Sequence, residues 1–158
     1  ISDAETLRAR MYAKKEEIVQ KDGFPQIPGV KEAIKRFHDE GFRLEVASSS
    51  AGYYIGRVLD ALEIRQYFEC YTSGEEVDHP KPAPDTFVRA MEKLKLKPED
   101  CLIVEDSTNG GKAAAAAGTK CVWFHNPDSG DQQISHAVLT ITSWSPENVD
   151  KLIDLMHA

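Results

Sequence analysis

Three groups of polar residues have types and spacing that could do chemistry, and each lies next to a segment with the pattern of a buried strand. Three hydroxyls, Ser48-Ser49-Ser50, follow the apolar Val46-Ala47. Lys81 stands in a stretch stiffened by two prolines, and Glu105-Asp106 directly follows an apolar run at 101–104. In an open parallel sheet, ligands bind at the carboxyl ends of the strands. We therefore expect these groups to converge on one edge of a sheet.

Each group has a functional and a purely structural interpretation. The serines could donate to an anion at a helix N-terminus, although one of them could simply cap that helix. Lys81 could hold an anionic substrate or a nearby carboxylate, or it could be a solvated side chain. Adjacent carboxylates at the end of a buried strand need a compensating cation, for which Mg²⁺ with a phosphate is a common solution, but Asp106 could instead be a helix N-cap. Together the groups favour a site for phosphate and Mg²⁺.

The composition is that of one ordinary globular domain. The 158 residues include 19 Lys and Arg against 26 Asp and Glu, a net charge of −7, and 41% are hydrophobic. This excludes disorder, collagen and coiled coil, and the lack of a basic stripe argues against nucleic acid as a partner. No apolar run reaches the ~18–20 residues of a membrane span, and the start has no signal-peptide pattern. Three cysteines that cannot all pair with one another fit a reducing cytoplasm.

Helical and strand-like patterns alternate along the chain. An amphipathic helix with a thin apolar face is expected at 4–20, followed by a breaker-rich linker at 22–29. The expected helices are 30–40, 53–62, 85–94, 108–118 and one from 146, and the expected strands are 43–47, 69–72, 101–104, 120–124 and 138–141. Such alternation predicts an α/β fold with a parallel sheet and helices on both faces. His79 and His125 fall in loops and are expected to be solvated.

The order of these motifs resembles the haloacid dehalogenase superfamily, in its branch of small-cap phosphatases and β-phosphoglucomutases. The matching residues are Ile27-Pro28-Gly29-Val30, Val46-Ala47-Ser48, Lys81-Pro82-Ala83-Pro84-Asp85, and Val104-Glu105-Asp106-Ser107 followed by Gly110. The match runs from about residue 25 to the C-terminus. It implies a three-layer Rossmann-like core over 23–158, with residues 1–22 as the last helix of a helical cap.

The resemblance also implies a function and a role for each site residue. Ser48 and Lys81 would be catalytic groups that, with Ser49, hold the phosphoryl group, while Asp106 and Glu105 would bind Mg²⁺. The parent protein would be a Mg²⁺-dependent phosphatase that acts on a small phosphorylated metabolite through a phospho-aspartate.

The sequence departs from the family pattern in three places. The family begins with a strand ending in Asp-x-Asp, which carries the nucleophile, and no such motif occurs here, so it would precede Ile1 together with most of the cap. Gly111 stands where the family usually has a branched apolar residue, which could loosen the helix start. Ala51 stands where the mutase branch tends to carry a lysine, which favours a phosphatase over the alternative of a phosphosugar mutase.

Two further interpretations remain. A receiver-type phosphoacceptor domain would place its acids before the hydroxyl and the lysine, the opposite of the order here. A non-catalytic binding or regulatory module that has lost the first motif stays open. In the resembled fold the first-motif strand lies between the strands 43–47 and 101–104, so we expect a gap there, filled by the missing N-terminal segment or by another copy of the chain.

Overall fold

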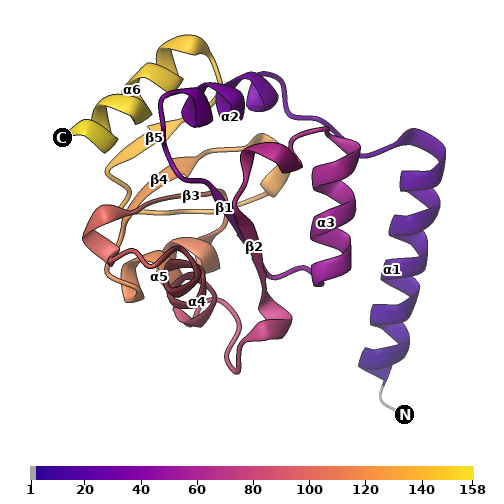
Figure 1. The fold of residues 1–158 in the computed structure, drawn as a ribbon. Helices are drawn as coiled ribbons and strands as arrows, with labels where there is room; N and C mark the ends of the chain where they lie inside the picture. The colour runs from indigo at the N-terminus through magenta and orange to yellow at the C-terminus, as the bar shows by residue number, and fades with distance from the viewer. Residues whose placement is uncertain (1–2) are drawn as a thin grey trace.

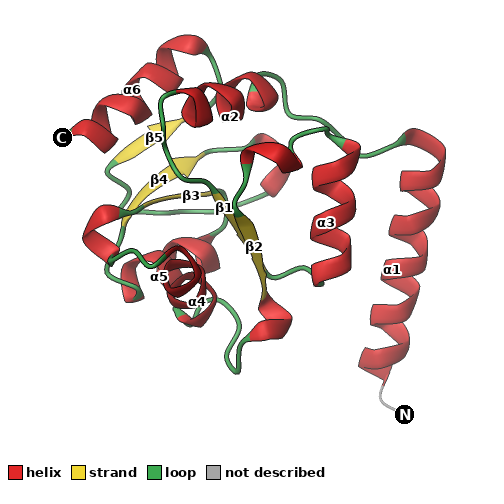
Figure 2. Ribbon diagram, viewed as in Figure 1, coloured by secondary structure: helices red, strands yellow, loops and turns green. Residues whose placement is uncertain are grey.

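The protein folds as a three-layer α/β structure (Figures 1 and 2). The structure is a computed structural model that describes residues 3–158. The helices are α1 (Asp3–Asp22), α2 (Val30–Asp39), α3 (Gly52–Ala61), α4 (Asp85–Leu94), α5 (Thr108–Ala116) and α6 (Pro146–His157). The strands are β1 (Glu45–Ser48), β2 (Cys70–Ser73), β3 (Leu102–Glu105), β4 (Lys120–Phe124) and β5 (Leu139–Ile141). The predicted alternation of strands and helices is thus confirmed.

The strands form two separate parallel sheets. β1 pairs with β2, so that Val46 lies opposite Tyr71, and the second sheet has the order β3-β4-β5, with Ile103 opposite Cys121. Among residues 3–158, β1 and β3 are not hydrogen-bonded to each other. This division lies where the family resemblance places a strand outside this sequence.

Helices cover both faces of the strands, as the continuously apolar strand sequences predict. On one face, Phe87 of α4 and the fully buried Ala113 and Ala114 of α5 pack with Cys121. The alanines have no side chain beyond Cβ, which lets α5 lie close to β4. On the other face, Leu152 of α6 packs against Val122. Burying one such aliphatic side chain contributes about 1.5–3 kcal/mol, so these contacts fix the helices that carry the loops of the site.

Most of the expected elements differ from the observed ones by one or two residues at an end. The first strand begins at Glu45 and ends at Ser48, two residues later at its start and one at its end, so Ser48 is the last strand residue rather than the first loop residue. Helix α4 has the expected bounds, with Pro84 as its N-cap. These differences are within the one or two residues by which definitions of helix and strand ends ordinarily disagree.

Helix α1 lies beside α3, away from the sheets (Figure 1). Arg57 of α3 makes two hydrogen bonds to Glu16, at 2.7 and 2.9 Å, and the ammonium of Lys15 lies 4.0 Å from the ring centre of Tyr54. The apolar Leu7 and Met11 of α1 are exposed. The expected helix is therefore present, while the assignment of residues 1–22 to a cap domain and of residues 23–158 to a core domain stays a prediction.

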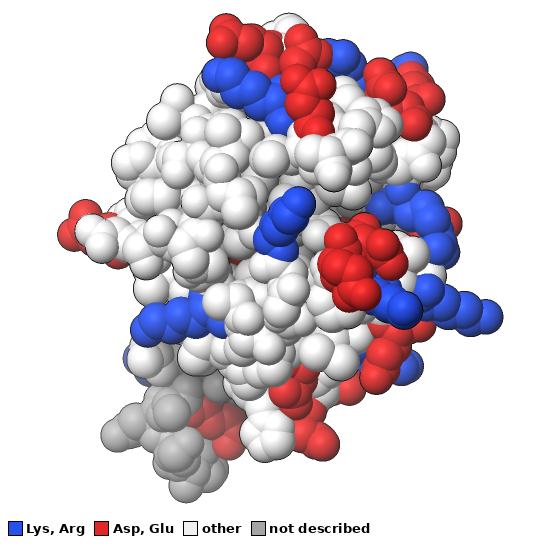
Figure 3. All heavy atoms as spheres, turned by 90° about the vertical axis from the view of Figure 1, so that its left-hand side faces the viewer, with Lys and Arg blue, Asp and Glu red and all other residues white. Residues whose placement is uncertain are grey.

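The surface shows no separation of charge on the face that lies at the left in Figure 1. Figure 3 shows acidic and basic side chains interspersed around this face, with a broad uncharged area between them. Within the described residues, no helix combines the length and the apolar character needed to cross a membrane.

A groove of about 230 Å³ separates β1 from β3. Apolar side chains from both helical layers line it, among them Phe87, Met91 and Leu152, together with Ala47 and Ile103 of the two facing strands. Glu45 also lines the groove. Its Oε1 accepts a hydrogen bond from the hydroxyl of Thr72, whereas its buried Oε2 has no partner within residues 3–158.

Because the carboxyl group of Glu45 is buried, we expect the stability of the fold to depend on pH through this group. Burial raises the pKa of Glu45 above its ordinary value of 4.5. The folded chain therefore holds this proton more tightly than the unfolded chain, and stability should decline as the pH rises above 4.5. Urea unfolding of the wild type and of Glu45→Gln, compared from about pH 4 to pH 8, should show the wild type losing stability relative to the variant. A difference that stays constant with pH would contradict the prediction.

Candidate functional site

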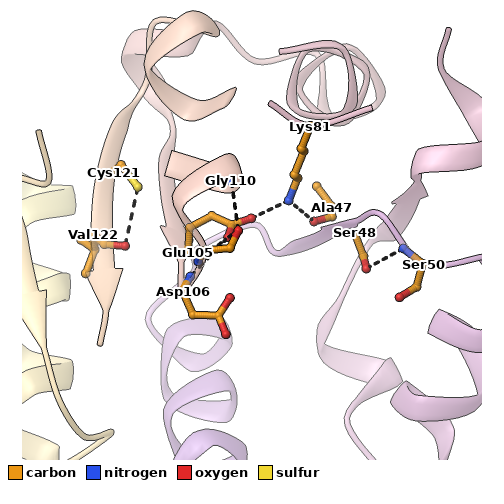
Figure 4. A network of polar contacts seen from close by, with 10 residues as sticks. Ala47, Ser48, Ser50, Lys81, Glu105, Asp106, Gly110, Cys121 and Val122 are labelled. Atoms are coloured by element: carbon orange, nitrogen blue, oxygen red, sulfur yellow. Dashed lines mark hydrogen bonds and ion pairs between the residues drawn. The ribbon is translucent and has the colours of Figure 1, made fainter. Parts of the chain in front are cut away.

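The candidate site lies where the carboxyl ends of β1 and β3 face each other. Ser48 ends β1, and Glu105 ends β3 and is followed by Asp106. Lys81, from the loop between β2 and α4, reaches into the space between them, as Figure 4 shows. The structure thus brings together the three groups that the sequence singles out.

Lys81 connects the two sheets. Its Nζ donates to Oε1 of Glu105 at 2.5 Å and to the backbone carbonyl of Ala47 in β1 at 3.2 Å. The side chains of Lys81 and Glu105 are only 8% and 10% exposed, and the ammonium lies 4.2 Å from the ring centre of Phe87. A charge pair in such a place loses most of its hydration, which only close pairing and further hydrogen bonds can offset. The solvated interpretation of Lys81 is therefore wrong.

The other oxygen of Glu105 is also fully engaged. Oε2 accepts hydrogen bonds from the backbone N–H of Asp106 at 3.2 Å and of Ser107 at 3.3 Å, and from the Ser107 hydroxyl at 3.0 Å. The repulsion expected between the adjacent acids is thus relieved by an internal cation and by donors. In this arrangement Glu105 could bind a metal only by exchanging one of these partners.

Gly110 is required by this packing of Glu105. It lies in the first turn of α5, and a Cβ built on it would overlap the carboxylate of Glu105. Only a residue without a side chain allows the carboxylate to lie against the helix.

Asp106 is half-buried, and its carboxylate points away from the pair of Lys81 and Glu105 (Figure 4). Its Oδ2 accepts a hydrogen bond of 2.5 Å from the hydroxyl of Ser129. The N-cap of α5 is Ser107, whose Oγ accepts from the N–H of Gly110 at 3.0 Å. Asp106 is therefore not a helix cap, and its Oδ1 is left for another ligand.

The serines after β1 do not cap the following helix. Ser48 Oγ accepts from the N–H of Ser50 at 3.1 Å, which leaves the hydroxyl proton free to be donated. The N-cap of α3 is Ala51, and the N–H of Gly52 is met from another loop by Glu75 at 3.3 Å. Helix capping therefore does not explain the run of three hydroxyls, whereas an anion-binding site would explain it.

Gly111 leaves no gap in the packing at the start of α5, and the expectation that it loosens this helix start stays a prediction. Gly111 is buried, and the space that a side chain would need there is filled by Ile134, which is 3% exposed. The apolar contact is supplied by a different part of the chain.

The described residues hold only part of a metal site. No group of three or more His, Cys, Asp or Glu side chains that could bind a metal occurs within residues 3–158. His79 is paired with Asp85 at 3.0 Å and is 75% exposed, and His125 is exposed beside the ring of Trp123, so both lie as expected. Asp106 offers a hard oxygen of the kind that Mg²⁺ prefers, but Mg²⁺ would need further ligands from a substrate, water or another segment.

Sequence reasoning missed Ser129 and Gln132. Gln132 accepts from the first N–H of α5, at Thr108, at 2.8 Å, and donates to the carbonyl of Ser129 at 3.1 Å. Both residues lie more than twenty positions beyond the acids, in a polar loop without a motif, so no spacing rule would have found them.

A model of the haloacid dehalogenase-like hydrolase family matches residues 1–124. The chain belongs to this family. A haloacid dehalogenase-like hydrolase domain-containing protein from Arabidopsis thaliana is 31% identical over 156 residues, which are 97% of this chain and 49% of that protein. Protein CbbY from Rhodobacter capsulatus is 34% identical over 125 residues, or 77% of this chain and 54% of the relative. This chain therefore spans about half the length of these family members.

Solved structures of the family confirm the fold. CbbY from Rhodobacter sphaeroides, in complex with phosphate, superimposes with a TM-score of 0.70 at 27% identity, over 76% of this chain and 55% of that one. A putative β-phosphoglucomutase from Thermotoga maritima gives a TM-score of 0.78 at 23% identity, over 98% and 71% of the two chains. At that identity the second likeness concerns the fold alone.

Replacing Gly110 by Ala should destabilise the chain by about 1–3 kcal/mol, because the new methyl group displaces Glu105 from Lys81. Gly52→Ala is a matched control, since its Cβ would come no closer than 3.8 Å to the nearest atom, in Tyr71. The free energies of unfolding in urea give the comparison. Equal stabilities of the two variants would show that Glu105 is not held as described.

Proposed function

We propose that the parent protein is a Mg²⁺-dependent phosphatase that works through a phospho-aspartate, and that this chain carries the groups that support the transfer. The observation that carries the proposal is that Lys81 contacts Ala47 and Glu105, the chain neighbours of Ser48 and Asp106, at the edge where β1 and β3 end. A hydroxyl donor, a buried ammonium and a carboxylate at one place suit the binding of a phosphoryl group with a divalent cation.

Each group has a distinct role in this proposal. Ser48 and Ser49 donate to phosphoryl oxygens, and Lys81 supplies positive charge from a position fixed by Glu105 and Ala47. Asp106 is a ligand of Mg²⁺, and Glu105, the second acid of the motif, contributes by holding Lys81 and the backbone of the turn. When bound, Mg²⁺ would neutralise charge on the phosphoryl oxygens.

The nucleophile is proposed to come from a strand that fills the groove between β1 and β3. Both strands turn an unpaired edge toward this groove, and the buried Oε2 of Glu45 lacks a hydrogen-bond partner among the described residues. Unpaired backbone groups and an unpartnered buried oxygen are costly, so an added strand would stabilise the fold. A strand running parallel to β1 and β3 would end beside Lys81. We assign it to the segment preceding this chain.

The proposed substrate is a small phosphorylated metabolite. Relatives include a phosphoglycolate phosphatase of Nitrosospira multiformis and a hexitol phosphatase of Escherichia coli. The residue at the start of α3 is the buried Ala51, so no basic side chain stands where the mutase branch tends to have one. A cytoplasmic location is proposed because the three cysteines are free.

The proposal predicts activity only when the chain is complete. The 158 residues alone should not hydrolyse p-nitrophenyl phosphate in the presence of Mg²⁺, whereas the protein extended by the upstream part of its reading frame should. In the extended protein, Asp106→Ala should lower turnover by on the order of a hundredfold or more. The exposed Asp154 of α6 provides a control variant, Asp154→Ala, which should keep normal turnover.

Several results would contradict this function. Mg²⁺-dependent hydrolysis by the purified 158 residues would exclude a nucleophile from outside them, and near-normal turnover of Asp106→Ala would remove the metal role. A start codon close to Ile1 would favour the non-catalytic module instead. If another copy of the chain fills the groove, it completes the hydrogen bonding without supplying the nucleophile, and extension would not restore activity.

A further inference from the structure

The loop of residues 126–134, which we call the clamp loop, holds the turn after β3 from outside. It begins at the carboxyl end of β4 with a short 3₁₀ helix, Pro127–Ser129, whose N-cap Asn126 accepts from the N–H of Asp128 at 3.1 Å. This local structure fixes the backbone of Ser129. It thereby directs the Ser129 hydroxyl to Oδ2 of Asp106 at 2.5 Å.

The side chain of Gln132 ties the clamp loop to the N-terminus of α5. Its Oε1 accepts from the N–H of Thr108, and its Nε2 donates to the carbonyl of Ser129, so one amide group spans the helix and the 3₁₀ turn. A second link runs the other way, since the N–H of Gln133 donates to the Thr108 hydroxyl at 2.9 Å. The hydroxyl of Ser129 is therefore held in place relative to α5.

An apolar contact completes the attachment. Ile134 fills the space above Gly111 in the first two turns of α5 and belongs to the same buried cluster as Ala113 and Ala114. Four contacts thus fix the clamp loop to three positions, namely Asp106, Thr108 and Gly111. Such redundancy is more than the connection of two strands requires.

We propose that Ser129 is a positioning residue for Asp106: its hydroxyl selects the side-chain rotamer in which Oδ2 is held by Ser129 and Oδ1 is left to bind a cation. This inference rests on the proposed metal role of Asp106, but its structural part stands independently. Partners that orient a carboxylate ligand commonly contribute 10–100-fold to metal affinity. In this proposal Ser129 acts through Oδ2 of Asp106 and is not itself a ligand of the cation.

The test follows the Asp106 side chain by NMR in the purified 158 residues. Three-bond couplings to Cγ of Asp106 report its χ1 rotamer, and a titration with Mg²⁺ alone, followed on the amides of residues 106–108, gives the affinity for the cation. The variants are Ser129→Ala, the conservative Ser129→Thr and the control Ser143→Ala, whose hydroxyl accepts from Asn148 at the start of α6.

We expect a single Asp106 rotamer in the wild type, in Ser129→Thr and in the control, and rotamer averaging in Ser129→Ala. The Mg²⁺ midpoint should rise about tenfold in Ser129→Ala alone. A single, unchanged rotamer in Ser129→Ala would overturn the inference, as would an unchanged Mg²⁺ midpoint. By contrast, rotamer averaging in Ser129→Ala, with Mg²⁺ binding equally well to the wild type and to Asp106→Asn, would contradict the proposed metal role while the positioning by Ser129 stands.

Discussion

One buried ammonium connects the two halves of this fold. The strands β1 and β3 share no backbone hydrogen bond within residues 3–158, and Lys81 is bound at once to the Ala47 carbonyl of one and to the Glu105 carboxylate of the other. Because the pair is about nine-tenths buried, neither charge can exist there without its partner. In the proposed function, the same constraint places this ammonium beside the phosphoryl group.

The rest of the site follows from satisfying this pair. The carboxylate of Glu105 lies over the first turn of α5, which requires Gly110 beneath it, and its second oxygen collects the donors of the Asp106–Ser107 turn. With Glu105 turned inward, Asp106 is the acid left to face outward, and Ser129 holds it from the opposite side. Lys81 therefore determines which of the two adjacent acids turns inward and which faces outward.

The strands, the helices and the convergence of Ser48, Lys81 and Asp106 could be predicted from the sequence, because alternating patterns determine a parallel fold and its strand ends. The clamp loop could not, since the hydrogen bond between Ser129 and Asp106 joins residues 23 apart without any shared motif. The inward turn of Glu105 was equally hidden, because sequence shows two neighbouring acids but not which of them meets Lys81. The gap between β1 and β3 could be predicted only from the family resemblance, because no periodicity within the chain reveals a missing strand.

A double-mutant cycle between Lys81 and Glu105 tests most directly whether this pair links the two sheets. The free energy of unfolding would be measured for the wild type, Lys81→Met, Glu105→Gln and the double variant. Each single change should cost about 3–5 kcal/mol, because it leaves the other charge buried and unpaired. The double variant should cost well below the sum of the two. Costs that add to within about 0.5 kcal/mol would show that the two side chains act independently and would contradict this account.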